Sequence, residues 1–355
     1  MAPVILELKK RAKDFKTQVC ISGQHRELVD QIIGNFNFQA DFDLNVMTKR
    51  QDLGKLTSRL IEGLYKIIES FKPDLILVQG DTTTAFVGAL AGFYKQIQVG
   101  HVEAGLRTRN KYAPFPEEMN RHLIGVLADH HFAPTNKAKF ELLKEGVNDK
   151  KILVTGNTVI DALFLALKRV RENPPLLGEL DALLSKGDRI VLITGHRREN
   201  FGEGFEKICQ AIKSLAKKFI DVNFVYPVHL NPNVQQPVRR ILGNLRNVSL
   251  TPPLDYFPFV WLMSRSSIIL TDSGGIQEEA PSLGIPVVVM REVTERSEAV
   301  EAGTAILVGT DKKKILETVS MLLTNEQAWK AMSQAANPYG DGKTSRRIVD
   351  YLAKI

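Results

Sequence analysis

A glycine-rich turn between a strand and a helix constrains the fold of this chain more than any other feature. The apolar run 267–270 has the pattern of a buried strand and leads into 271–279, Thr-Asp-Ser-Gly-Gly-Ile-Gln-Glu-Glu. A helical segment closed by Gly284 follows, and the apolar run 286–290 completes a β-turn-α-β unit. Paired glycines at such a turn let backbone N–H groups approach an anion, and the helix N-terminus adds favourable partial charge. An ordinary helix cap is the structural alternative, and the turn alone leaves both interpretations open.

Strands and helices are predicted to alternate along nearly the whole chain, which is typical of parallel sheets covered by helices on both faces. The strand-like runs are residues 18–22, 74–79, 96–100, 130–133, 152–155, 189–194, 222–227, 248–251, 267–270, 286–290 and 305–308. Helical patterns include residues 53–71, 83–94, 117–127 and 136–145. The sequence therefore predicts an α/β fold.

Two doubly wound, Rossmann-like domains are expected, because 355 residues are enough for two hydrophobic cores. Residues 169–188 contain Pro174, Pro175 and Gly178 and have the composition of a hinge or inter-domain connection. Ligands of such folds bind at the carboxyl ends of the strands, so we expect the site in a cleft between the domains.

The composition excludes several classes of protein. Hydrophobic residues make up 44% and charged residues 25% of the chain, as in ordinary globular proteins. The net charge of +7 suits an anionic ligand, but the basic residues are dispersed, so no nucleic-acid partner is expected. Cys20 and Cys209 lie far apart, which indicates a reducing cytoplasm and no structural zinc. No apolar run approaches the roughly 18 residues of a membrane span, and residues 1–15 do not resemble a signal peptide.

Three polar clusters follow predicted strands, where chemistry is expected in this fold class. Asp81 lies in Gly-Asp-Thr-Thr-Thr at 80–84, Glu103 lies in 100–107, and His196 lies in Thr-Gly-His-Arg-Arg-Glu at 194–199. Each cluster also has a structural explanation, since Asp81 could be a helix cap and a lone histidine is usually packed or solvated. Glu117 and Glu118 follow Pro116 and could simply favour the first turn of a helix. The combination of carboxylates in one domain with histidine, arginine and paired glycines in the other favours an anion site.

Common cofactor motifs are incomplete. Residues 202–207 offer half of a dinucleotide fingerprint without its third glycine. Residues 340–344 resemble the end of a P-loop, but Asn337 occupies the place of the first glycine. The sequence lacks His-Glu-x-x-His and shows no acidic cluster with metal-ligand spacing. No cofactor and no metal are therefore implied.

Several strings together resemble the bacterial, non-hydrolysing UDP-N-acetylglucosamine 2-epimerases. They are residues 80–84, 100–107, 115–121 (Phe-Pro-Glu-Glu-Met-Asn-Arg), 155–161 (Thr-Gly-Asn-Thr-Val-Ile-Asp), 194–199, 226–232 (Tyr-Pro-Val-His-Leu-Asn-Pro) and 271–281. The similarity runs in order through essentially the whole chain. It implies a glycosyltransferase-B architecture with an N-terminal domain of residues 1–168, onto which 339–355 packs back, and a UDP-binding domain of residues 169–338. It also implies a homodimer.

The resemblance implies reversible conversion of UDP-GlcNAc into UDP-ManNAc by elimination of UDP to 2-acetamidoglucal and re-addition. The C2 proton has no adjacent carbonyl, so the reaction needs carboxylates to move this proton and a cationic cradle for UDP. By motif, the catalytic residues are Asp81, Glu103, Glu117 and His196, and His196 lies by the diphosphate. Which carboxylate removes the proton and which returns it stays open.

Further positions are carried over from the same motifs. The substrate-binding residues are Arg107, Arg198, Phe259, Ser273, Gly274, Gly275, Glu279 and Arg296, with Glu279 on the ribose. The motifs that lie near a second UDP-GlcNAc site in regulated relatives contain Gln24, His25, Arg26 and His229. Structural roles for this second group remain an equal alternative.

The start of the chain departs from the family pattern. Residues 2–8, Ala-Pro-Val-Ile-Leu-Glu-Leu, predict a helix with proline in its first turn. The family has a strand and Gly-Thr-Arg-Pro-Glu-Ala-Ile-Lys before this helix, and its arginine and lysine contribute to the substrate site. A late-assigned start codon or a truncated gene is the hypothesis, and weak or absent activity with reduced stability is expected if residues 1–355 are the whole product.

Three other functions remain as alternatives. A glycosyltransferase of the same fold would transfer the sugar to an acceptor, and a hydrolysing epimerase would release free ManNAc. A non-catalytic nucleotide-sugar-binding protein would bind UDP-GlcNAc without turnover.

Overall fold

The computed structural model describes residues 1–24, 26–48 and 52–355 and divides the chain into two compact units. Unit 1 comprises Met1–Ala162 and Tyr339–Ile355, and unit 2 comprises Leu163–Pro338. Helix α7 (Thr158–Glu172) carries the chain from one unit into the other. The units divide after Ala162, six residues before the domain boundary expected from the sequence. His25, a predicted regulatory residue, lies outside the described residues.

Unit 1 is built on a four-stranded parallel sheet in the order β3-β4-β5-β6. Its strands are β3 (Leu75–Gln79), β4 (Gln98–Val102), β5 (His130–Ala133) and β6 (Ile152–Val154). The helices between and before them are α3 (Leu53–Phe71), α4 (Thr83–Tyr94), α5 (Glu117–Leu127) and α6 (Asn136–Lys144). A separate two-stranded parallel sheet pairs β1 (Cys20–Ile21) with β2 (Phe42–Asp43), with α2 (Arg26–Phe36) between them.

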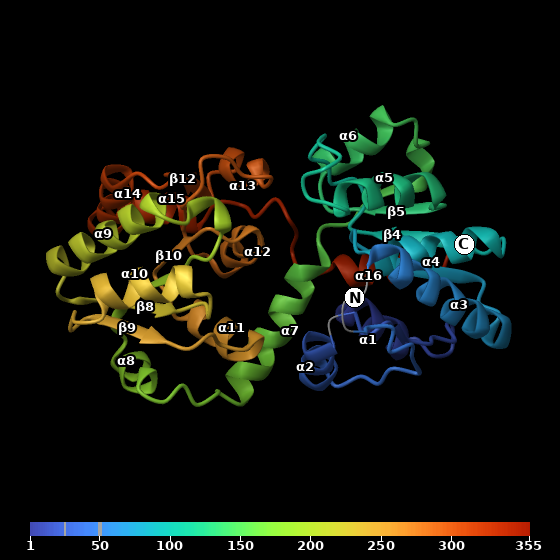
Figure 1. Ribbon diagram of the computed structural model, residues 1–355, viewed down its shortest axis with the longest axis horizontal. Coiled ribbons are helices and arrows are strands. Elements are labelled where there is room, and N and C mark those ends of the chain that lie inside the picture. Colours follow the sequence, from blue (N-terminus) through green and yellow to red (C-terminus); the bar gives the residue numbers. More distant parts are fainter. Residues whose placement is uncertain (25, 49–51) are drawn as a thin grey trace. The chain divides into compact units, whose positions relative to one another are not determined.

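Two helices from opposite ends of the sequence share one core of unit 1. Helix α1 (Ala2–Lys10) buries Val4 and Leu8 in one core with Ile348 and Val349 of α16 (Thr344–Leu352). The two helices are in contact, and Figure 1 shows them next to each other. Asp161 fixes the start of α16, because its carboxylate accepts the backbone N–H groups of Thr344 and Ser345 at 3.1 and 2.8 Å. The C-terminal segment therefore belongs structurally with the first sheet.

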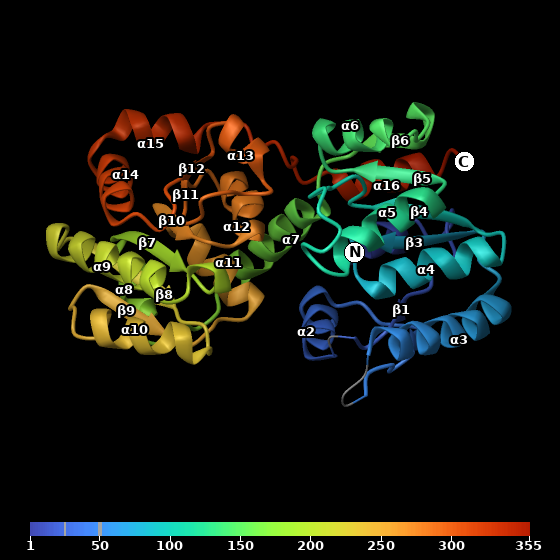
Figure 2. The ribbon, with the colours of Figure 1, turned by 45° about the horizontal axis from the view of Figure 1, so that its top comes forward.

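Unit 2 contains a six-stranded parallel sheet in the order β12-β11-β10-β7-β8-β9, which can be followed in Figure 2. The strands are β7 (Arg189–Thr194), β8 (Val222–Pro227), β9 (Val248–Thr251), β10 (Ile268–Thr271), β11 (Val287–Val289) and β12 (Ala305–Leu307). The helices are α8 (Leu180–Lys186), α9 (Glu203–Lys218), α10 (Pro232–Leu242), α11 (Tyr256–Ser264), α12 (Gly274–Glu279), α13 (Ser297–Glu301), α14 (Lys312–Thr324) and α15 (Glu326–Ser333). Helices α9, α10 and α14 bury apolar side chains in a common core with alternate residues of the central strands.

The predicted α/β class is confirmed, since both units have parallel sheets whose strands alternate with helices. One segment is more ordered than its composition suggested. Residues 169–188 include the last turn of α7 and the whole of α8, where Leu180 and Leu184 lie one turn apart and are buried. Apolar spacing at i and i+4 thus outweighs the preceding prolines and glycine. Within the described ranges, the longest and most apolar helices still fall short of what crossing a membrane requires.

Candidate functional site

The first predicted catalytic carboxylate, Asp81, follows the end of strand β3. Gly80 has a φ of +71°, a conformation that glycine adopts without strain, and its N–H donates to the Val102 carbonyl at 3.0 Å. Thr82 caps α4, because its hydroxyl accepts the Ala85 N–H at 3.2 Å. Asp81 is therefore not the cap of this helix, and its carboxylate remains available for other contacts.

Asp81 is tied to the beginning of α5. Arg121 Nε and Nη2 lie 2.8 and 2.7 Å from Asp81 Oδ2, and Asn120 Nδ2 donates to the Asp81 carbonyl at 2.8 Å. The Asp81 side chain is 26% exposed. The structure thus holds an anionic group in a fixed position while leaving part of it accessible.

Glu118 holds the other side of the same arginine. Its buried carboxylate accepts from Arg121 Nη1 at 2.8 Å and from the backbone N–H groups of Thr108 and Arg109 at 3.0 and 2.9 Å. Burial raises the pKa of Glu118, but these donors outweigh burial, so that the pKa lies below its usual value. Glu118 therefore anchors α5 to the loop before it as an ionised group.

Glu117 has a different environment from its neighbour. It is the first residue of α5, directly after Pro116, and is half-buried. Among the described residues, its carboxylate has neither a hydrogen bond nor an ion pair. A carboxylate at this position without a structural partner suits proton transfer better than an anchoring role.

Glu103 lies beside the Asp81 turn. It follows β4 with a φ of +66°, which is uncommon for a residue with a side chain and is found at functional sites that the surrounding structure holds in place. Gln79 Nε2 donates to Glu103 Oε2 at 3.3 Å, and a Cβ at Gly80 would lie 3.8 Å from the same oxygen. Unit 1 therefore brings Glu103 and the Asp81 turn together.

His101 supports this turn from within the sheet. Burial lowers its pKa to about 3, so the imidazole is neutral, and Nε2 therefore carries the proton donated to the Gly80 carbonyl at 2.8 Å. This donor fixes the backbone immediately before Asp81.

Arg107, a predicted substrate-binding residue, has an internal partner in this structure. Its side chain is 1% exposed and pairs with Glu145 through two bonds, at 2.8 Å from Nε and 2.7 Å from Nη2. His122 bridges Glu145 and Glu118, with Nδ1 3.1 Å from Glu145 Oε1 and Nε2 3.4 Å from Glu118 Oε1. A continuous series of polar contacts thus runs from Asp81 to Arg107, whose side chain is buried at its end.

The glycine-rich turn of unit 2 joins β10 to α12. Ser273 precedes the helix without a side-chain capping bond, and a Cβ at Gly275 would meet no described atom within 4 Å. A Cβ at Gly274 would lie 3.3 Å from Glu295 Oε1 and 3.5 Å from Arg296 Cζ, so this ion pair, at 3.2 Å, lies beside the turn. Arg296 Nε in turn donates to Glu278 at 2.8 Å. A turn of this kind at a helix start, with an arginine beside it, is compatible with the predicted phosphate site, which stays a prediction.

Glu279 and Phe259 come from adjacent helices of unit 2. The Tyr256 hydroxyl at the start of α11 donates to Glu279 Oε1 at 3.0 Å. Burial raises the pKa of Glu279 to about 7, against the opposing effect of the tyrosine. Phe259, half-buried, lies one turn further along α11.

His196 lies in the loop after β7, and its ring stacks on His229 with centroids 5.3 Å apart and planes inclined by 13°. The structure therefore joins a predicted catalytic residue to a predicted regulatory one. Burial lowers the pKa of His196, while Asp272 opposes that effect. Arg198, three residues after Gly195, is exposed and has no ion pair in the part of the chain that the structure describes.

The other predicted regulatory residues belong to unit 1. Gln24 Oε1 accepts from the Thr84 hydroxyl at 2.7 Å, which links it to the segment that carries Asp81. Arg26 pairs with Asp30 at 3.2 Å and with Asp43. Their positions are compatible with a structural role, and their regulatory role stays a prediction.

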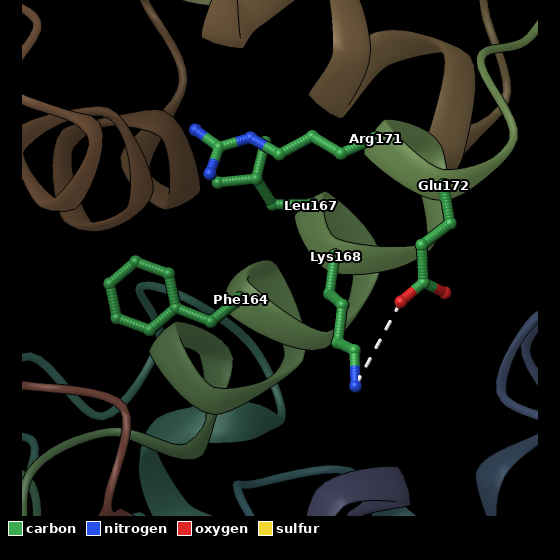
Figure 3. A pocket seen from close by; sticks show the side chains of 5 residues that line it. All are labelled: Phe164, Leu167, Lys168, Arg171 and Glu172. Atoms are coloured by element: carbon green, nitrogen blue, oxygen red, sulfur yellow. Dashed lines mark ion pairs between the residues drawn. The ribbon is translucent and has the colours of Figure 1, made fainter.

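A pocket on α7 is lined by other residues, all of them in unit 2. Figure 3 shows its lining, Phe164, Leu167, Lys168, Arg171 and Glu172, with Lys168 and Glu172 in an ion pair at 3.9 Å. None of the predicted site residues lines it. Among the residues that the structure describes, no group of three or more histidine, cysteine, aspartate or glutamate side chains could hold a metal.

Sequence reasoning missed the residues that position the predicted ones. Arg121 and Asn120 appear in a matching motif, but their contacts with Asp81 span about forty residues. Asp272 precedes the glycine turn and contacts the backbone of the His196 loop. Their place at strand ends and in a first helical turn is a signal that a search for positioning residues could have used.

Comparisons with known proteins match nearly the whole chain. Residues 7–353 match the sequence profile of a family described as UDP-N-acetylglucosamine 2-epimerase. The UDP-N-acetylglucosamine 2-epimerase of Escherichia coli K12 is 53% identical over 357 residues, which cover 99% of this chain and 94% of that protein.

Solved structures agree with this match. The UDP-GlcNAc 2-epimerase of Neisseria meningitidis bound to UDP-GlcNAc shows 48% identity and a TM-score of 0.87, covering 100% of this chain and 96% of that one. The sucrose-phosphate synthase of Thermosynechococcus elongatus shows 14% identity and a TM-score of 0.55 over 87% of this chain and 80% of its own. The second likeness concerns the fold alone, a two-domain α/β architecture of the glycosyltransferase-B type.

Proposed function

The chain belongs to the UDP-N-acetylglucosamine 2-epimerase family, a family of isomerases, and on that premise we propose that it interconverts UDP-GlcNAc and UDP-ManNAc. The reaction eliminates UDP across C1–C2, giving 2-acetamidoglucal, and adds UDP back with the opposite configuration at C2. The observation that carries the proposal is the group of carboxylates in unit 1, in which Asp81 is fixed by Arg121 yet partly accessible and Glu103 lies beside the Asp81 turn.

The acid–base groups of the proposed reaction are Asp81, Glu103 and Glu117. The C2 proton is weakly acidic, so a positioned base must remove it as UDP departs, and an acid must return it on the other face of the sugar. Arg121 of α5 keeps the Asp81 carboxylate in place, and Glu117, the first residue of α5, has no structural partner in the described ranges. Asp81 and Glu117 are therefore the proposed pair for removing and returning the C2 proton, and their order stays open.

Unit 2 supplies the proposed binding site for UDP. The N–H groups at Gly274 and Gly275 and the guanidinium of Arg296 suit the diphosphate. Glu279 suits the ribose hydroxyls as an acceptor, and His196 suits the oxygen that leaves C1. Arg198, Phe259 and Arg107 complete the substrate contacts that the family motifs imply, and Arg107 is also paired with Glu145 within unit 1.

We also propose a homodimer, as is typical of the family, through an apolar face of unit 1. Met119, Leu123 and Val126 recur on one side of α5 and are 38, 41 and 84% exposed. Phe93 and Tyr94 at the end of the adjoining helix α4 are also exposed. A surface of this kind on two packed helices is typical of a contact between protein chains.

Incubation with UDP-GlcNAc alone in deuterated water tests the proposed function. The expected product is UDP-ManNAc carrying deuterium at C2, identified by NMR, with UDP-GlcNAc re-forming from added UDP-ManNAc. Free ManNAc would indicate a hydrolysing enzyme, and turnover that depends on an added acceptor would indicate a glycosyltransferase. Binding without any turnover would leave a nucleotide-sugar-binding protein.

A further inference from the structure

Asp272 is a buried carboxylate immediately after strand β10 that braces the loop carrying His196. Its side chain is fully buried, and Oδ2 accepts the backbone N–H groups of His196 and Arg197, each at 2.8 Å. Asn200 Nδ2 adds a longer contact to the same oxygen at 3.4 Å. One carboxylate oxygen of Asp272 therefore holds the backbone of the His196 loop in place.

The second oxygen of Asp272 points toward the His196 side chain. Oδ1 lies 3.7 Å from His196 Nδ1, and among the described residues it has no hydrogen-bond partner. A buried carboxylate oxygen without a donor is unfavourable, so the imidazole N–H is the donor that this geometry calls for. At 3.7 Å the two atoms are too far apart for a hydrogen bond in the free protein, and catalytic contacts of this kind often shorten when substrate binds.

The other contacts of the His196 imidazole leave one of its two nitrogens available to a ligand. His229, which follows β8, covers a face of the ring by stacking, and Nδ1 is turned to Asp272. The His196 side chain is nevertheless 44% exposed. Since the two nitrogens lie on different edges of the imidazole, Nε2 is the one that can reach a bound molecule.

We infer that Asp272 is the positioning residue of His196, holding the imidazole with its proton on Nδ1 and stabilising the imidazolium that donates from Nε2 to the departing diphosphate. This inference rests on the proposed function and deepens it. In the elimination step the C1–O bond breaks, its electron pair goes to the diphosphate oxygen, and the C2 proton goes to a carboxylate. His196 keeps its proton and contributes a charged hydrogen bond to the new oxyanion.

The charged groups around the ring decide how its protonation depends on pH. Asp272 raises the pKa of His196, whereas burial, His229 and Arg197 lower it, and Arg197 is itself 3.8 Å from Glu295. The diphosphate of the substrate would add negative charge and favour the imidazolium. Removing the charge of Asp272 therefore lowers the pKa of His196, and the falling limb of kcat against pH moves to lower pH.

Nitrogen-15 NMR of histidine-labelled protein tests the inference without any assay of activity. The His196 resonances are assigned with the variant His196→Asn. In the unsubstituted protein the neutral ring is expected to carry its proton on Nδ1. A neutral His196 protonated on Nε2 would overturn the inference, and this reading stands even if the variants below fail to fold.

Substitution Asp272→Asn is the second arm of the test. The amide oxygen can still accept the two backbone N–H groups, but its NH2 group would face Nδ1 and favour the wrong tautomer. We expect a fall in kcat of about 100-fold, a lower pKa of His196 and little change in the dissociation constant for UDP. An unchanged tautomer, His196 pKa and kcat would reduce Asp272 to a backbone brace and contradict the inference.

Tyr226→Phe is the matched control, because the buried Tyr226 of β8 donates its hydroxyl to the carbonyl of Gly195 in the His196 loop at 2.8 Å. It is expected to lower the melting temperature without altering the tautomer of His196. A tautomer change of the same size in this variant would show that general loosening of the loop, rather than Asp272, controls the ring. If the unsubstituted protein makes no UDP-ManNAc, the proposed function fails while the NMR result still decides the assignment of Asp272.

Discussion

Neighbouring glutamates at the start of α5 have opposite roles. Glu118 is 1% exposed and accepts from an arginine and two backbone N–H groups, so its charge is committed to the fold. Glu117 has no such partner among the described residues, and Asp81 is held through Arg121 with a quarter of its side chain accessible. Residue type and sequence position alone do not separate these carboxylates. Their contacts do.

Substituting the proposed acid–base groups is expected to stop the chemistry while sparing nucleotide binding. Asp81→Asn or Glu117→Gln removes a proton acceptor from unit 1, and each is expected to lower kcat by about 10²- to 10⁴-fold. UDP binding, measured by calorimetry, is expected to stay within a few-fold of the unsubstituted value, because its proposed ligands belong to unit 2. Full activity of both variants would remove these carboxylates from the mechanism.

Glu118 makes the contribution of α5 to the free energy of unfolding depend on pH. Its pKa in the folded state is below the unfolded value, so its stabilising effect is present above the ordinary carboxyl pKa of about 4.3 and is lost as pH falls further. Glu118→Gln is therefore expected to lower the free energy of unfolding by about 2 kcal/mol at pH 7, and by much less near pH 3. Urea titrations at the two pH values measure the difference.

Glu317→Gln on α14 is the control for this prediction. Glu317 is 63% exposed and 3.8 Å from Lys313, a surface pair that contributes little to stability. An equal loss in both variants, or a Glu118→Gln effect that does not depend on pH, would contradict the anchoring role.

At the scale of elements, the strand-to-helix turns determine where the candidate groups lie. The predicted runs 130–133, 189–194, 222–227 and 248–251 coincide with strands β5, β7, β8 and β9. Flanking glycine and polar residues mark where such short strands begin and end. The connection 169–188 was less well predicted, since burial of Leu180 and Leu184 depends on tertiary packing. The Arg107–Glu145 pair spans 38 residues and the Asp272–His196 contact 76, which local pattern does not encode.

Pairing of α11 with α12 predicts a pH-dependent affinity for the nucleotide sugar. Burial raises the pKa of free Glu279 to about 7, and ribose hydroxyls that donate to it would favour the ionised form. Affinity for UDP-GlcNAc is therefore expected to weaken as pH falls from 8 to 6, with protons released on binding near pH 7. Calorimetry in two buffers of different ionisation enthalpy measures both effects.

Glu279→Gln is expected to weaken binding and abolish this pH dependence. Tyr256→Phe removes the hydroxyl that donates at 3.0 Å and is expected to raise the pKa of Glu279, moving the loss of affinity to higher pH. A pH dependence that survives in Glu279→Gln would assign it to another group.

For the molecule as a whole, the apolar face of α4 and α5 predicts association of two copies. Val126→Glu places a charge on a side chain that is 84% exposed in the single chain, and it is expected to convert a dimer into a monomer in light-scattering measurements. Ile220→Glu in unit 2 is a matched control, because Ile220 is also 84% exposed, and it is expected to leave the dimer intact. A dimer that tolerates Val126→Glu, or a monomer before any substitution, would contradict the proposed interface.

Cleavage of the C1–O bond is the central claim for the whole enzyme, and positional isotope exchange tests it most directly. UDP-GlcNAc is prepared with oxygen-18 in the bridge between the sugar and the β-phosphorus and is incubated with the enzyme. The account predicts that recovered UDP-GlcNAc and UDP-ManNAc carry part of the label in non-bridging positions, detected by phosphorus NMR. Formation of UDP-ManNAc with all of the label still in the bridge would contradict it, because C2 would then invert without departure of UDP.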